Sequence, residues 1–388
     1  MNRKLLLIII SGVLVLFLSI GALLARTSPK DNSYSYLTIF SNVIHLVDSN
    51  YVDDVDFNKV LDSALQGMVE NLDGESFFIR GKDLAAYKKQ LQDNEDRADV
   101  GITLSKRLGM VVVVAVEKES TAHENKIKAG DFIRSIDTQY VQNFALYHIY
   151  HLLKGDPGTQ VKVSVFRSAL EKPEEFTLTR RSVRKPYLES YIAEPKIGYI
   201  RIIHLRPGVE NEIEKKLEAF GRQGVQQLIL DLRGCTEENL DLAVKVADVF
   251  VGATTIVQVS SRAGTSQTIV GDDKIAFKGR LLALTDYTTV GGAEIIAGAI
   301  QDSGAGKIFG TRTFGRGGVQ KLLPAGENYV VLTTQKYLTP KGRTILQNGV
   351  EPAIPYKEEL KKADQAEEED RMLNQAIEQL RYPEKKAA

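Results

Sequence analysis

Apolar and polar positions follow a different period in each part of the chain, and the first part is almost entirely apolar. Residues 5–25 hold 21 positions without a charge, directly after Arg3 and Lys4. A helix of that length spans a hydrocarbon core of roughly 30 Å. Because basic flanks stay in the cytoplasm, residues 1–27 are predicted to anchor the chain in a membrane, with the rest on the extracytoplasmic side. A cleaved signal is the alternative, since Gly21 and Ala22 are small.

A helical period follows in the next part of the chain. Residues 28–96 are predicted to form a helical N-terminal region, because apolar residues recur at helical spacing in two runs. Asp56, a residue type that caps helix N-termini, precedes the second run. The apolar positions are Leu37, Phe40, Val43, Ile44, Val47, Val60, Leu61, Ala64, Leu65, Met68 and Leu72.

Short β-branched runs replace the helical period between residues 97 and 181. Strands are predicted at residues 101–104, 110–116, 132–136 and 161–166, with turns such as DPG at 156–158 between them. One helix-like stretch, residues 146–153, interrupts the strands. The pattern predicts a small, mostly β module.

Strands and helices then alternate over residues 182–356. Strands are predicted at residues 197–203, 227–232 and 281–285, helices at 209–223, 239–250 and 293–302, and β-rich sequence at 329–337. This order favours α/β layering. The tail, residues 357–388, is highly charged, but Met372, Leu373, Ala376, Ile377 and Leu380 keep helical spacing, which indicates a docked or partner-seeking helix.

Composition narrows the choice of partners and of compartment only a little. The chain has 388 residues, and its 43% apolar content is enough for a sizeable core. Lys plus Arg and Asp plus Glu both number 50, so no basic field recruits nucleic acid, and nucleic acid is excluded as a partner. The single cysteine, Cys235, cannot form an internal disulfide.

Eight short motifs then follow one another along the chain. They are LDGESFF at 72–78, IKAGDFI at 127–133, LLKGDPGT at 152–159, LILDLR at 228–233, AEIIAGAIQD at 293–302, TFGRGGVQ at 313–320, YLTPKGR at 337–343 and GVEP at 349–352. In this order they resemble the carboxyl-terminal processing, or tail-specific, proteases from about residue 37 to 355. The resemblance implies a PDZ domain at 97–181 and an α/β core at 182–356 with ClpP/crotonase-like layering.

In that family a Ser/Lys dyad cuts peptide bonds. A neutral lysine takes the proton of the serine, and a glutamine orients the lysine. The motifs place the serine on Gly291, the lysine on Arg316 and the glutamine on Gln320. Glycine has no side chain to attack with, and a guanidinium with a pKa above about 12 cannot serve as a neutral base.

The resemblance also implies an oxyanion hole built from backbone amides near a Gly-Gly turn. This chain has Thr236, Glu237 and Glu238 in that turn. Carboxylates repel a developing oxyanion, and the lost glycines restrict the backbone geometry. No catalytic residue is therefore expected to function, and these positions are vestigial.

Other residues offer weak substitutes for the lost nucleophile. Thr288 and Thr289 lie just before the vestigial serine position, but no nearby base is implied. Cys235 is either a reactive thiol or, preferably, a small semi-buried residue. His123 and His204 have no acidic partner at a recognisable spacing, so a Ser/His/Asp triad is unsupported. No metal ligands have suitable spacing, and no cofactor is expected.

The PDZ groove of the family takes a C-terminal peptide by strand addition, and backbone amides of a short loop hold its carboxylate. In this chain Asp99 replaces a glycine of that loop and puts a carboxylate beside the anion pocket. Aromatic residues on the helix would shape side-chain preference, or would simply pack the module. The predicted peptide-binding residues are Asp99, Val100, Gly101, Ile102, Tyr147, Tyr150 and His151.

Three functional hypotheses remain. The first is a membrane-anchored, extracytoplasmic pseudoprotease in a bacterial-type envelope, which binds protein or peptide C-termini as adaptor, scaffold or regulator. It could form homo-oligomers or mixed oligomers with an active paralogue. The second is an active serine-type endopeptidase with an unrecognised nucleophile, and the third is a structural envelope component. The sequence decides neither the client nor the oligomeric state.

Overall fold

The computed structural model describes residues 32–93, 97–107, 109–167, 172–181, 187–356 and 370–381. The predicted anchor at residues 5–25 lies outside this set. Among the described residues, no helix combines the length and the apolar character that a membrane span requires. The chain divides into two compact units, residues 1–64 and 65–388.

The first unit consists of α2 (Asn32–Asn50) and the start of α3 (Phe57–Glu70). Asp56 precedes α3, and its Oδ1 accepts hydrogen bonds from the amides of Asn58 at 3.1 Å and Lys59 at 3.3 Å. These bonds satisfy donors that the first turn of a helix leaves unpaired. The predicted N-cap is confirmed.

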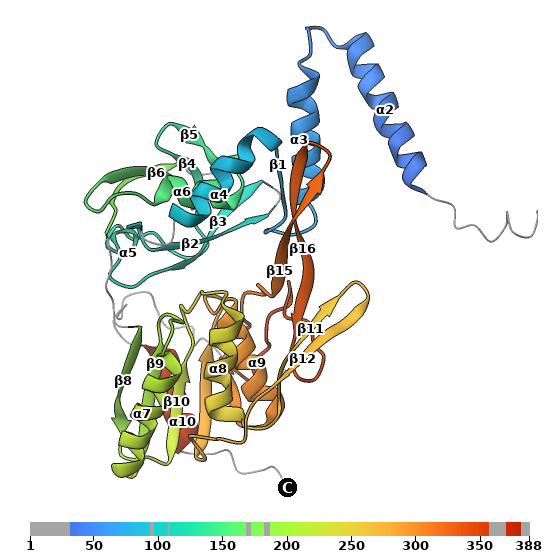
Figure 1. Ribbon diagram of the computed structural model, residues 1–388. Coiled ribbons are helices and arrows are strands. Elements are labelled where there is room, and N and C mark those ends of the chain that lie inside the picture. Colours follow the sequence, from blue (N-terminus) through green and yellow to red (C-terminus); the bar gives the residue numbers. More distant parts are fainter. Residues whose placement is uncertain are drawn as a thin grey trace, which may run out of the picture. The chain divides into compact units, whose positions relative to one another are not determined.

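A six-stranded antiparallel sheet forms the PDZ-like module of the second unit (Figure 1). Its order is β2-β3-β4-β6-β7, with β5 paired to β4. Val111, Val113, Val161, Val163 and Val165 alternate along β3 and β6, and all are buried because one face of the sheet covers the core of the module. The elements are β2 (Ile102–Arg107), β3 (Met110–Val116), α5 (Thr121–Glu124), β4 (Phe132–Ile136), β5 (Gln139–Tyr140), η2 (Val141–Asn143), α6 (Leu146–Leu153), β6 (Gln160–Phe166) and β7 (Glu174–Thr179).

Strand β2 runs to Arg107, beyond the predicted end at residue 104. The prediction stopped short because Ser105 and Lys106 are polar, yet both are buried. Lys106 Nζ pairs with Glu70 Oε1 at 2.7 Å and donates to the Phe144 carbonyl at 2.9 Å. A buried ammonium needs such partners, and they come from segments distant in sequence.

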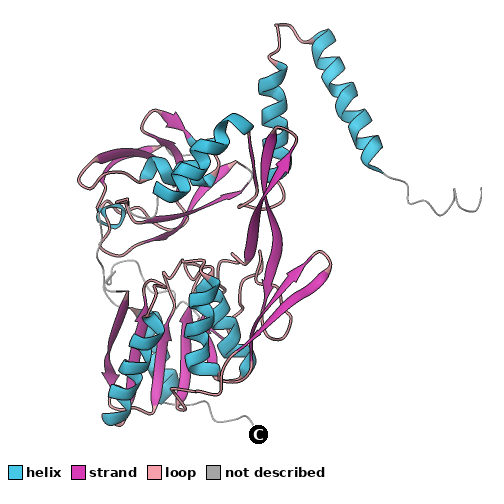
Figure 2. Ribbon diagram, viewed as in Figure 1, coloured by secondary structure: helices cyan, strands magenta, loops and turns pink. Residues whose placement is uncertain are grey.

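The α/β core contains a second six-stranded sheet, of order β17-β14-β13-β10-β9-β8, parallel except for β8. Helices α7, α8 and α9 cover one face and α10 the other, so the sheet is the middle of three layers (Figures 1 and 2). The fold class predicted from the sequence is confirmed. The elements are β8 (Leu188–Glu194), β9 (Ile197–Ile202), α7 (Val209–Arg222), β10 (Gln227–Asp231), α8 (Leu240–Val251), β13 (Arg280–Thr285), α9 (Gly292–Ser303), β14 (Gly306–Gly310), β17 (Ile354–Pro355) and α10 (Arg371–Arg381).

A third sheet joins the motif segment near residue 75 to the core. Strand β1 pairs antiparallel with β16, with Phe77 opposite Val331. This pairing places residues 72–78 against the core, although they precede the PDZ-like module in sequence. The strands of this sheet are β1 (Phe77–Ile79), β11 (Thr255–Ser261), β12 (Gly264–Val270), β15 (Gly318–Ala325) and β16 (Asn328–Leu338). Two helices follow β1 in sequence, η1 (Gly81–Asp83) and α4 (Leu84–Asp93).

The tail helix α10 docks on the parallel sheet. Ala376 and Leu380 are buried against sheet residues that include Ile229 and Leu282. Arg280 donates to the Leu380 carbonyl at 3.2 Å, one of the carbonyls that a helix C-terminus leaves unpaired. Of the two predicted roles, the docked helix is the one that the structure bears out.

Candidate functional site

A cavity of about 940 Å³ lies between the PDZ-like module and the α/β core. It receives residues of the predicted peptide groove and residues of the predicted former catalytic apparatus. His151 and Gly291 are not part of its lining. The predicted residues that line it are Asp99, Val100, Gly101, Ile102, Tyr147, Tyr150, Thr236, Glu237, Glu238, Arg316 and Gln320.

Gly291 lies beneath the turn at residues 235–238. Gly292 N donates to the Glu237 carbonyl at 2.7 Å, and Val290 N donates to the Cys235 carbonyl at 3.0 Å. Gly291 has φ +64°, and a Cβ added there would lie 2.9 Å from the Glu237 carbonyl oxygen. The turn therefore presents carbonyl oxygens to this segment, whereas an oxyanion hole requires amide donors.

Glu294 fixes the backbone at the two positions predicted for the dyad, Gly291 and Arg316. Its side chain is fully buried at the start of α9. Oε2 accepts from Gly291 N at 3.0 Å and from Arg316 N at 2.8 Å, so one oxygen holds both segments. Oε1 accepts from Gly315 N at 2.7 Å and from the Thr313 hydroxyl. Burial raises the pKa of Glu294, and these hydrogen bonds oppose that rise.

Arg316 is buried at the position predicted for the lysine base. Its Nε lies 3.1 Å from Glu75 Oε1, its Nη1 donates to Glu238 Oε1 at 3.1 Å, and its Nη2 donates to the Leu104 carbonyl at 2.7 Å. Burial acts to lower the pKa of the guanidinium, but the charges of Glu75 and Glu238 outweigh burial and raise it. This side chain is a permanent cation that holds together β2, the turn of residues 235–238 and the segment before β1.

Glu75 is a partner that sequence reasoning missed. Asp73 Oδ1 accepts from the amides of Glu75 at 2.9 Å and Ser76 at 2.7 Å, and this turn directs the Glu75 side chain toward Arg316. Burial raises the pKa of Glu75 to about 7, although the Arg316 charge acts to lower it. The only signal in the sequence was its place in the LDGESFF motif.

His204 joins the PDZ-like module to the core. Its Nε2 lies 3.2 Å from Glu117 Oε1, and its Nδ1 hydrogen-bonds to Glu237 Oε1. Hydrogen bonds to Glu117 and Glu237 raise the pKa of His204 to about 9 against the effect of burial. The sequence showed no acidic partner for His204, because the two glutamates are 87 and 33 residues away.

Stability is expected to depend on pH through His204. The folded-state pKa of about 9 exceeds the ordinary value of 6.5, so the imidazolium contribution is complete below pH 6.5 and is lost as the pH rises through 9. We expect His204→Gln to cost on the order of 2 kcal/mol at low pH and almost nothing above the folded-state pKa. Urea unfolding of both proteins across this range measures the difference, and a constant difference would contradict the bridge.

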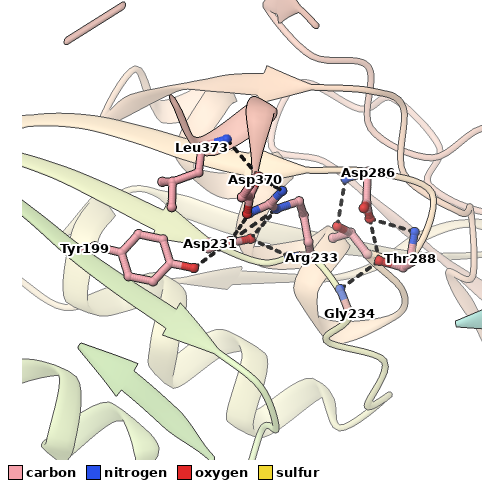
Figure 3. Close-up of polar contacts among 9 residues, drawn as sticks. Tyr199, Asp231, Arg233, Gly234, Asp286, Thr288, Asp370 and Leu373 are labelled. Atoms are coloured by element: carbon pink, nitrogen blue, oxygen red, sulfur yellow. Dashed lines mark hydrogen bonds and ion pairs between the residues drawn. The ribbon is translucent and has the colours of Figure 1, made fainter. Parts of the chain in front are cut away.

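Thr288, the proposed substitute nucleophile, has a structural role at the end of β10 (Figure 3). Its hydroxyl donates to Asp286 Oδ1 at 2.5 Å and accepts from Gly234 N at 2.8 Å. Thr289 is buried and accepts from Asp286 N at 3.1 Å. Neither threonine lines the 940 Å³ cavity. The Thr288 hydroxyl thus joins its turn to Gly234, and the Thr289 hydroxyl stabilises its own turn.

The same figure shows how the tail helix reaches this end of the sheet. Arg233 pairs with Asp231, and its Nη1 donates to Asp370 Oδ1 at 2.9 Å, just before α10 (Figure 3). Tyr199 donates to Asp231 Oδ2 at 2.8 Å. Asp370 N-caps α10 by accepting from Leu373 N at 3.0 Å. The network anchors the strand end that leads into the turn of residues 235–238.

Cys235 is fully buried, and burial raises the pKa of its thiol well above the ordinary value. The neighbouring Glu237 carboxylate acts in the same direction, so the reactive thiolate is disfavoured. In the described parts of the chain, no group of three or more His, Cys, Asp or Glu side chains could hold a metal ion.

The loop predicted to hold the carboxylate of a peptide is residues 99–102, and the side chain of its first residue, Asp99, already binds an amide of this loop. Asp99 Oδ1 accepts from Gly101 N at 2.8 Å. Gly101 has φ +78°, and a Cβ there would collide with Ser120, so only glycine fits. The amide of Gly101 is therefore already paired with a carboxylate.

The aromatic residues of α6 divide into three environments. Tyr147 packs against Tyr87 and Phe77, with ring centroids 4.7 and 5.1 Å away. Tyr150 lines the cavity, and its hydroxyl accepts from Leu104 N at 2.7 Å and donates to Leu104 O at 3.3 Å. His151 Nδ1 faces Arg97 Nη1 at 3.1 Å, and His151 does not line the cavity.

Comparisons with known proteins agree with these features. Residues 196–356 match the model of Peptidase family S41, and residues 98–178 match the PDZ domain. A carboxy-terminal-processing protease of Bartonella bacilliformis is 28% identical over 370 residues, which cover 91% of this chain and 82% of that protein. The carboxy-terminal processing protease CtpB of Bacillus subtilis is 27% identical over 325 residues, 81% of this chain and 66% of that protein.

A solved structure shares the fold. The photosystem II D1 C-terminal processing protease superposes with a TM-score of 0.68 at 24% identity, over 84% of this chain and 88% of the other. The cavity between the two modules, the PDZ match and the S41 match thus point to one group of proteins. The chain combines a segment that matches the PDZ domain with a core that matches Peptidase family S41, and it is similar to the carboxy-terminal processing proteases over most of its length.

Proposed function

We propose that this chain is a pseudoprotease, which binds peptide segments of client proteins, their C-termini included, without cleaving them. The observation that carries the proposal is the paired guanidinium of Arg316, a permanent cation at the position of the base. Gly291, whose backbone is held by the same Glu294 oxygen, offers no attacking atom. Proton abstraction and nucleophilic attack both lack a group.

The cavity supports binding. About 940 Å³ lies within the usual range of ligand pockets, roughly 300–1,000 Å³. Val100, Leu146 and Leu153 are buried apolar residues in its wall, suited to an apolar side chain of an extended peptide. The edge strand β2 lies beside them, and strand addition to such an edge is a common mode of peptide recognition.

The proposal includes the membrane and the extracytoplasmic side as the place of work. Its support is the uncharged stretch of residues 5–25 behind Arg3 and Lys4. Membrane fractionation of cells expressing the full chain, followed by protease treatment of intact cells, tests this. Recovery of the chain in the cytosol would contradict it.

A cleavage and binding assay tests the function. The full chain is incubated with β-casein, an unfolded protein, and the mixture is followed by gel electrophoresis and by fluorescence anisotropy of labelled casein. We expect an anisotropy increase and no fragments. The alternative, an active endopeptidase with a relocated nucleophile, is tested with Thr288→Val plus Thr289→Val.

Fragments that disappear in this double variant, but not in the matched control Thr268→Val on exposed strand β12, would overturn the pseudoprotease. Fragments that persist in the double variant would indicate a contaminant or a nucleophile elsewhere. If the assay yields no fragments and the anisotropy of labelled casein does not change, the result would favour the hypothesis of a structural envelope component.

A further inference from the structure

Strand β2 is the edge of the PDZ sheet that faces the cavity. It pairs with β3 on one side only, and Ile102 and Thr103 line the cavity beside α6. An edge strand presents unpaired N–H and C=O groups, and a peptide binds by pairing with them. The state of these backbone groups therefore determines whether the groove can accept a peptide.

At Leu104 both backbone groups are occupied by side chains of this chain. The N–H donates to the Tyr150 hydroxyl at 2.7 Å. The C=O accepts from Arg316 Nη2 at 2.7 Å and from the Tyr150 hydroxyl at 3.3 Å. In an antiparallel ladder a residue directs both groups to the same side, and every second residue faces outward. Leu104 is thus an outward-facing position whose pairing capacity is used up.

The neighbouring loop is occupied as well, since Asp99 accepts from Gly101 N at 2.8 Å. Three backbone groups of this loop and strand are then paired within the protein: Gly101 N, Leu104 N and Leu104 O. Tyr150 belongs to the PDZ domain, but Arg316 belongs to the S41 core. One of the three contacts therefore crosses between the modules.

We infer that Arg316 acts as an autoinhibitory contact, which closes the peptide groove by pairing with the Leu104 carbonyl and must leave it when a peptide adds to β2. This inference rests on the proposed peptide-binding function. The residue at the place of the catalytic base would then regulate access to the groove.

Coupling between the modules follows from this arrangement. Arg316 donates to β2 while it pairs with Glu238 of the core turn, so a peptide on β2 removes one tie between PDZ domain and core. Peptide binding to β2 therefore competes with contact between the PDZ domain and the core. The competition is reciprocal, so a change that strengthens this contact lowers the affinity for the peptide by the same factor. Two further ties, Thr103 to Thr236 at 3.2 Å and Glu117 to His204, are left in place.

Two variants open the groove from different sides. Arg316→Gln removes the shorter of the two hydrogen bonds to the Leu104 carbonyl. Tyr150→Phe removes the acceptor for the Leu104 amide and the longer hydrogen bond to the carbonyl. We expect each to bind a fluorescein-labelled, alanine- and valine-rich nonapeptide about three- to tenfold more tightly than the unchanged full chain in anisotropy titrations, the worth of about one hydrogen bond. Because Arg316→Gln leaves Glu75 without its partner, Tyr150→Phe is the variant that preserves the fold.

The controls are an arginine and a tyrosine outside the cavity. Arg222→Gln breaks an exposed ion pair with Glu218 on α7, and Tyr140→Phe alters an exposed tyrosine of the PDZ domain. Both are expected to bind the nonapeptide as the unchanged chain does.

The outcomes separate the inference from the function. If the unchanged chain binds the nonapeptide and neither variant binds more tightly, the autoinhibitory contact is wrong while peptide binding stands. If no protein binds it, both fail. Hydrogen exchange gives a second measurement: added nonapeptide should leave the amides of 102–107 protected in Tyr150→Phe, whereas that variant alone should exchange Leu104 N–H faster. If the Leu104 N–H exchanges at the same rate in Tyr150→Phe as in the unchanged chain, the claim that side chains occupy the edge of β2 would be wrong.

Discussion

Replacing Glu294 with alanine is expected to lower the free energy of unfolding by about 4 kcal/mol. The fully buried carboxylate accepts from three backbone amides, of Gly291, Gly315 and Arg316, and from the Thr313 hydroxyl. Alanine leaves these donors buried without acceptors, and each unpaired donor carries its desolvation cost. Urea unfolding of the full chain, followed by tyrosine fluorescence, measures the loss.

The matched control is Glu218→Ala on α7, where the carboxylate is exposed and pairs only with Arg222. Its expected effect is below about 0.5 kcal/mol. Glu294→Gln keeps the shape of the side chain, but it replaces one accepting oxygen with an NH₂ group that cannot accept from the backbone amides. We expect about half of the loss in unfolding free energy that Glu294→Ala causes. A loss below about 1 kcal/mol in Glu294→Ala would show that water or a rearranged loop satisfies the donors.

Restoring the two dyad residues alone, with Gly291→Ser and Arg316→Lys, is expected to leave proteolysis within about tenfold of background. A serine at position 291 would have to adopt φ +64°, and its Cβ would lie 2.9 Å from the Glu237 carbonyl oxygen. A lysine at position 316 lies between Glu75 and Glu238, whose charges favour its protonated form. The turn still presents carbonyls where amides are needed. Cleavage of a quenched fluorescent casein measures the rate.

Adding Glu237→Gly, Glu238→Gly and Glu75→Gln removes the carboxylates and frees the turn to present its amides. We expect these changes to raise the rate at least about a hundredfold over the double variant, the usual worth of an oxyanion donor. The matched control carries the three added changes with Gly291 and Arg316 unaltered, and it should remain at background. Robust cleavage by the double variant alone would show that the turn of residues 235–238 supports an oxyanion hole without these changes.

Periodicity predicted the regular elements well where packing follows the sequence pattern. Strands β3 and β4 and helix α6 have the predicted bounds, because each is a short, mostly apolar run. Strands β7, β8, β11, β12, β14 and β15 were missed. Among them, β15 is largely exposed and β12 carries many polar residues. Such strands are stabilised by cross-strand pairing, which a local pattern does not contain.

The candidate site was predicted only in part. Alignment of motifs placed Arg316 and Gln320 in one region, and both line the cavity with the turn of residues 235–238. The same reasoning placed His151 in the groove, but His151 is not part of the cavity lining, and its ring faces Arg97, which is. A helix face is readable from spacing, but which part of that face meets a cavity depends on the neighbouring element.

The sequence by itself determined the fold class and the order of the modules, because these depend on residue type and local period, and its motifs predicted Gly291 and Arg316 at the positions of the serine and the lysine. The tertiary structure decided what the remaining charges do. Arg316 pairs with Glu75, Glu238 and the Leu104 carbonyl, and His204 lies between two glutamates. These partners are distant in sequence, and only the packed chain brings them within the few ångströms over which a buried charge must find its counterpart.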